Sequence, residues 1–75
     1  MKEKIENILM NVRPDVDFAT EKHLITDGIM ESIDIISLVT ELEDEFDITI
    51  APDVLVAKNF NSLEAIVKMV SELVD

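Results

Sequence analysis

The chain has 75 residues, enough for one small domain, so the sequence predicts a single domain spanning residues 1–75. Its 17 acidic and 6 basic residues give a net charge of −11, which argues against nucleic-acid binding because phosphate contacts need clustered lysine and arginine. It has no cysteine, so disulfides, cysteine-bound metals and thiol catalysis by its own side chains are excluded. No apolar run approaches about 18 residues and no secretory signal follows Met1. We therefore expect a cytoplasmic monomer without membrane insertion.

The first helix is predicted over residues 3–12, where apolar residues recur at the spacing of one helix face. These residues are Ile5, Ile8, Leu9 and Val12. Pro14 ends the helix, since proline lacks an N–H donor and restricts the residue before it. A long loop follows over residues 13–31 and contains Gly28, the only glycine. Three apolar residues are expected to anchor this loop on the core: Phe18, Leu24 and Ile25.

The strongest helical pattern covers residues 32–46. Five apolar residues lie within an arc of about 100° on this helix and are predicted to form its buried stripe. They are Ile35, Leu38, Val39, Leu42 and Phe46. Ser32 lies at the start of the helix, where N-capping alone would explain a serine.

The residues after this helix are less regular. Pro52 interrupts an apolar run that would otherwise suit a strand, and a lone strand would leave its backbone groups unpaired. We expect Ile48 and Ile50 to turn inward, followed by a short third helix near residues 53–58.

A fourth helix is predicted over residues 62–74, capped by Asn61 or Ser62. Its apolar residues are Leu63, Ile66, Val67, Val70, Leu73 and Val74. Together these elements predict an all-α four-helix bundle, with a long loop between the first two helices and a short third helix.

No catalytic set is recognisable, because His23 is the only imidazole and no serine has a base at helical spacing. Acidic residues gather toward the end of the second helix. They are Glu41, Glu43, Asp44, Glu45 and Asp47. They lack the alternating ligands and central glycine of a calcium loop. We therefore expect no catalytic residue and no metal site, and a solvated surface that faces a basic partner.

A second face of helix 32–46 carries Ile33 and Ile36 beside Ser32, well away from the buried stripe. Three polar residues share this face: Ser37, Thr40 and Asp44. An apolar centre with a charged rim is typical of a docking surface.

The segment DGIMESIDIISLVTELEDEFDITI resembles the core motif of acyl carrier proteins. Ser32 falls on the serine that carries 4′-phosphopantetheine in that family, and Ile33 and Asp34 match the two residues after it. Further apolar and acidic matches are Leu38, Leu42, Glu43, Glu45, Phe46 and Ile50. The chain length, the acidity and the helical pattern extend the resemblance over essentially the whole sequence.

The resemblance implies a carrier and not an enzyme. Ser32 would bear 4′-phosphopantetheine, transferred from coenzyme A, and the chain would shuttle thioester-linked acyl or aminoacyl groups. The implied partners are a phosphopantetheinyl transferase, acyl or aminoacyl ligases, and acyltransferases or synthases with basic docking patches. The partner-binding residues implied on this chain are Glu31, Ile33, Asp34, Ile36, Thr40, Glu43 and Asp44.

Two departures from the family pattern leave the subfamily open. Glu31 stands where the family usually has an aspartate that helps to hold the magnesium ion used by the transferase. Gly28 lies four residues before Ser32, a spacing similar to that of D-alanyl carriers of lipoteichoic acid modification and of carriers used with adenylating ligases. The alternative from another class is an acidic interaction module that binds one partner through Ile33 and Ile36 and never accepts the prosthetic group.

Overall fold

Four α-helices follow one another along the chain: α1 (Lys2–Val12), α2 (Ser32–Phe46), α3 (Ala57–Phe60) and α4 (Leu63–Val74). A single 3₁₀ turn, η1 (Pro52–Val54), precedes α3. The computed structural model of the protein describes residues 1–74, and within them it contains no strand. The prediction of an all-α four-helix protein is confirmed.

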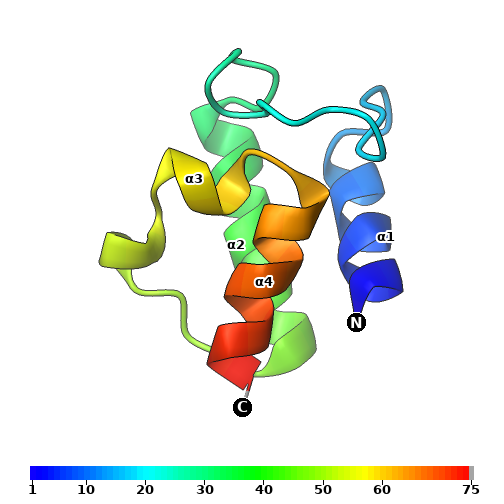
Figure 1. Ribbon diagram of the computed structural model, residues 1–75. Helices are drawn as coiled ribbons and strands as arrows, with labels where there is room; N and C mark the ends of the chain where they lie inside the picture. Colours follow the sequence, from blue (N-terminus) through cyan, green and yellow to red (C-terminus); the bar gives the residue numbers. More distant parts are fainter. Residues whose placement is uncertain (75) are drawn as a thin grey trace.

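The three longer helices form the body of the molecule, and the long loop closes one end of it (Figure 1). α1 runs in the direction opposite to α2 and α4 and packs against both, whereas the short α3 packs on α4. Residues 13–31 cross the end of the bundle at which α2 begins. Within residues 1–74, no helix has the length and the apolar content that a membrane span requires.

The core contains the apolar residues that were predicted to be buried from their helical spacing. On α2, Leu38 and Leu42 are fully buried. The other three members of the predicted stripe are partly buried and pack against the core: Ile35, Val39 and Phe46. The loop anchors Phe18 and Leu24 are buried as predicted, and Ile25 is half-buried. Met30 is a further buried anchor that the sequence analysis missed.

The ends of α2 and α4 follow from local chemistry. α2 spans the predicted residues and ends at Asp47, which adopts a left-handed backbone conformation with φ of 53°; aspartate tolerates this conformation better than most residues. Ser62 is the cap of α4, because its Oγ accepts a hydrogen bond from the N–H of Ala65 at 3.1 Å.

Ile50 is buried and Ile48 is half-buried, so both turn inward as expected.

The prediction of one short helix near residues 53–58 is wrong. The structure divides this region into η1 and α3, with Leu55 and Val56 between them. Val56 has an extended backbone (φ −119°, ψ 152°), which suits a β-branched residue better than a helix does. The side chain of Asn59 donates a hydrogen bond to the carbonyl of Val54 at 2.8 Å and so holds the interruption in place.

The charge distribution predicts how the fold responds to salt. The ion pairs Lys4–Glu45 and Lys22–Glu64 are exposed, and exposed pairs contribute little. The carboxylates greatly outnumber the basic residues and repel one another. Added salt screens this repulsion. We therefore expect the melting temperature to rise with sodium chloride, as measured by thermal melts followed by circular dichroism. A melting temperature that falls as salt is added would mean that attractive ion pairs outweigh the repulsion.

Candidate functional site

Ser32 is the first residue of α2 and has an exposed side chain. The N-cap is not Ser32 but Glu31, whose backbone is extended (φ −96°, ψ 174°). Asp34 completes this helix start, since its Oδ2 accepts a hydrogen bond from the backbone N–H of Glu31 at 2.9 Å. The interpretation of Ser32 as a capping residue is therefore wrong. Among the hydrogen bonds within residues 1–74, none involves the hydroxyl of Ser32.

The loop before Ser32 turns at Gly28. This residue has φ of +71°, a conformation that glycine adopts without strain. The N–H of Gly28 donates to the carbonyl of Ile25 at 3.0 Å, and the N–H of Met30 donates to the carbonyl of Leu24 at 2.9 Å. These hydrogen bonds and the buried Met30 side chain bring the chain from the loop into α2.

Arg13 connects the end of α1 to the start of α2. Its guanidinium donates two hydrogen bonds to the carboxylate of Asp15, at 2.9 and 3.0 Å, and its Nη1 donates to Asp34 Oδ2 at 2.9 Å. The N–H of Glu31, together with this guanidinium, holds the pKa of Asp34 below its usual range. Asp34 is therefore a carboxylate at neutral pH, and its negative charge is used in the ion pair with Arg13.

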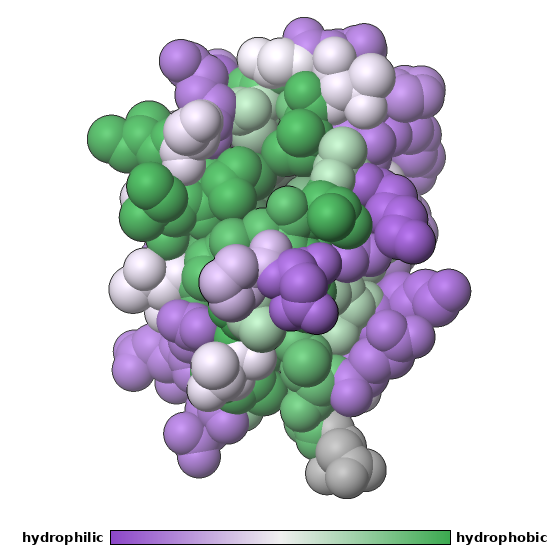
Figure 2. Space-filling view, turned by 90° about the vertical axis from the view of Figure 1, so that its left-hand side faces the viewer, coloured by the Kyte–Doolittle hydropathy of each residue, from purple (hydrophilic) through white to green (hydrophobic). Residues whose placement is uncertain are grey.

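The face of α2 that carries Ile33 and Ile36 is open to solvent. Their side chains are 71% and 66% exposed, and the polar residues Thr40 and Asp44 beside them are exposed as well. Figure 2 shows apolar side chains gathered on the side of the molecule that carries α3, with hydrophilic residues at the edges. Leu55 and Val56, in the interruption before α3, add to the exposed apolar surface.

Sequence reasoning missed Leu55 and Val56 because it placed them inside a helix. The sequence signal for this exposed apolar segment was the pair of apolar residues that directly follows Pro52–Val54. The structure also gives Glu43 a contact that sequence did not show: its Oε2 accepts a hydrogen bond from the N–H of Ile50 at 2.8 Å. The carboxylates of Asp34 and Glu43 thus connect the first and the last part of α2 to backbone N–H groups just outside the helix.

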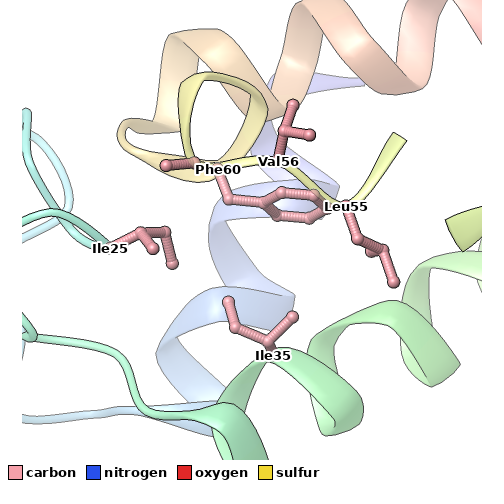
Figure 3. Close-up of a pocket in the computed structure, with 6 residues that line it drawn as sticks. Ile25, Ile35, Leu55, Val56 and Phe60 are labelled. Carbon is pink, nitrogen blue, oxygen red and sulfur yellow. The ribbon is translucent and has the colours of Figure 1, made fainter. Parts of the chain in front are cut away.

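An apolar pocket of about 80 Å³ lies between α2, the long loop and the chain around α3. Side chains from the long loop, from α2 and from the chain around α3 converge on it, and the ring of Phe60 enters between them (Figure 3). Its lining consists of Ile25, Ile35, Leu55, Val56, Ala57 and Phe60. His23 is exposed and lies outside this lining.

Comparison with known proteins establishes the family. Residues 3–70 match the family described as "Phosphopantetheine attachment site", and the chain belongs to this family of carriers. It is also 31% identical to a D-alanyl carrier protein of Lactococcus lactis subsp. cremoris strain MG1363, over all of this chain and 98% of the relative. The D-alanyl carrier protein of strain SK11 matches equally well. No solved structure matches the chain significantly.

Membership in this family means that the protein is a carrier that binds 4′-phosphopantetheine covalently. The structure offers a suitable place for the phosphate of this group. The Ser32 hydroxyl is exposed at the first position of a 15-residue helix, and the N-terminus of a helix favours a phosphate through its free N–H groups and dipole. The residues present therefore fit the group.

Proposed function

We propose that Ser32 is the attachment site and that the chain carries thioester-linked acyl or aminoacyl groups between enzymes. The exposed hydroxyl of Ser32, used by no contact within residues 1–74 at the start of α2, is the observation that carries this proposal. In the attachment step, Ser32 Oγ loses its proton and forms a bond to the pantetheine-bearing phosphorus of coenzyme A. The phosphoanhydride bond breaks and 3′-phosphoadenosine 5′-phosphate leaves.

The group supplies the thiol that a chain without cysteine lacks. The chain's own contribution is attachment and recognition. Ile33 and Ile36 form the apolar centre of the proposed docking face, and Glu31, Thr40 and Asp44 form its polar rim. Enzymes with basic surfaces fit this rim and the net charge of −11, which favour fast, salt-sensitive encounters.

Within the proposed docking set, Asp34 and Glu43 serve a second purpose. Their carboxylates accept hydrogen bonds from the backbone of Glu31 and Ile50. We assign to these two residues the task of holding the docking face in shape, and to the exposed residues the direct contact with the partner.

Two observations favour an aminoacyl cargo over a long acyl chain. The curated relatives are D-alanyl carrier proteins. The apolar pocket measures about 80 Å³, whereas an engineered cavity that binds benzene measures about 150 Å³. This volume is small for a long acyl chain, whereas a small polar group such as D-alanine needs no apolar pocket.

The proposed function is tested by incubating the chain with coenzyme A, magnesium and a broad-specificity phosphopantetheinyl transferase. We expect the intact mass to increase by one phosphopantetheine group. A wild-type chain that stays unmodified favours the interaction module. Glu31→Asp serves as the matched variant: if this variant alone is modified, the residue before the serine, and not the fold, prevents the reaction.

The cargo is tested on the modified chain. It is offered to a D-alanine-activating ligase with ATP and, separately, to an acyl-activating ligase with a long-chain fatty acid. A mass increase with D-alanine and none with the fatty acid supports an aminoacyl carrier, and the opposite result supports an acyl carrier.

A further inference from the structure

We propose that Arg13 is a positioning residue for Ser32: it holds the Ser32 segment (residues 29–34) in the orientation in which the transferase modifies it. This inference rests on the proposed function. Arg13 is not among the residues proposed to contact partners directly and does not line the apolar pocket; it reaches the docking set through its contact with Asp34.

A single nitrogen of Arg13 contacts both ends of the Ser32 segment. Nη1 donates a hydrogen bond to the carbonyl oxygen of Ile29 at 2.8 Å and a second to Asp34 Oδ2 at 2.9 Å. Ile29 precedes Ser32 and Asp34 follows it, so the two acceptors lie on either side of the attachment residue. The guanidinium therefore spans the segment that carries the reactive hydroxyl.

Arg13 is itself oriented by hydrogen bonds to a nearby carboxylate. It directly follows α1, and its Nε and Nη2 bind the two carboxylate oxygens of Asp15. Such two-point contacts to a planar guanidinium fix its orientation. The side chains of Arg13 and Asp34 are only 25% and 14% exposed, so salt screens this contact less than a surface pair. The Ser32 segment is thereby tied to the end of a packed helix.

The other contacts of the segment hold it to the long loop and to its own helix, as in the hydrogen bond from the N–H of Met30 to the carbonyl of Leu24. Met30 is buried and anchors one point of the segment in the core, and Asp34 accepts the N–H of Glu31. Without Arg13, the carbonyl of Ile29 and the carboxylate of Asp34 lose their connection to α1. Phosphoryl transfer depends on an aligned nucleophile, and a misplacement of about 1 Å can cost ~10²-fold in rate.

The test compares Arg13→Gln, Arg13→Lys and the matched control Lys22→Gln in steady-state kinetics with the transferase. We expect kcat/KM to fall about tenfold in Arg13→Gln, because a smaller fraction of chains presents Ser32 correctly. Arg13→Lys keeps the charge but not the planar donor group, so it should restore part of the loss. Lys22→Gln removes the same charge from the same loop and breaks the Lys22–Glu64 ion pair, yet should leave kcat/KM unchanged.

Hydrogen exchange of the unmodified chain gives a second readout. In Arg13→Gln we expect faster exchange confined to the Ser32 segment, with α4 as well protected as in the wild type. The proposal is overturned if Arg13→Gln is modified at the wild-type rate, or if Lys22→Gln loses as much. It is also overturned if protection falls throughout the chain, since Arg13 would then support the fold in general. A wild-type chain that is never modified refutes the proposed function itself, and the mass spectrum of the wild type shows this separately.

Discussion

Replacing Ser32 with alanine is expected to abolish the phosphopantetheine mass increment while the helical circular-dichroism spectrum stays nearly unchanged. The hydroxyl of Ser32 forms no capping hydrogen bond, so its removal leaves no buried partner unsatisfied. Alanine is also the strongest helix former. The free energy of unfolding should therefore change by no more than about 0.5 kcal/mol, as for an ordinary surface substitution.

Ser37→Ala is the matched control for this experiment. Ser37 is an exposed serine on the same helix, so it offers the transferase a similar hydroxyl in a different place. The Ser37 variant should still gain the full mass increment, because it keeps the hydroxyl of Ser32. Modification of the Ser32→Ala chain, or loss of modification in the Ser37→Ala chain, would show that the attachment site is assigned to the wrong serine.

Leu42→Ala is expected to reduce the free energy of unfolding by roughly 2–5 kcal/mol, because it removes a large buried side chain and leaves a cavity. Leu42 is 0% exposed and belongs to the core. A loss of this size is a large fraction of the total stability of a small domain, typically about 5–15 kcal/mol. Such a loss leaves a small domain with little stability at physiological temperature.

Ile36→Ala, on the opposite side of the same helix, provides the contrast. Ile36 is 66% exposed, so its truncation should cost within about 0.5 kcal/mol, yet weaken binding of the transferase. Denaturant unfolding of both variants measures the first effect, and a binding titration of the Ile36 variant measures the second. Similar stability losses in the two variants would mean that the faces of α2 are assigned incorrectly, and unchanged binding would remove Ile36 from the docking face.

Local pattern predicted the long helices well because burial follows a period of 3.6 residues. The predicted bounds of α2 agree with the structure, and its buried and exposed faces lie where the spacing of Leu38, Leu42, Ile33 and Ile36 places them. Gly28, the only glycine of the chain, lies in the long loop and has a positive φ. The third helix was misplaced because Leu55 and Val56 suit a short helix and an extended segment equally well by composition.

The fold class, the buried face of α2 and the position of Ser32 at its start could all be predicted from the sequence. These properties depend on the order of apolar and polar residues within a few turns of one helix. The hydrogen bonds of the polar residues, in contrast, became known from the folded arrangement of the helices and loops. The contact of Arg13 with Asp34 joins positions 21 residues apart, and the carboxylate of Glu43 turns to the backbone of Ile50. Such contacts depend on how the loops return to the helices, and no local pattern encodes that path.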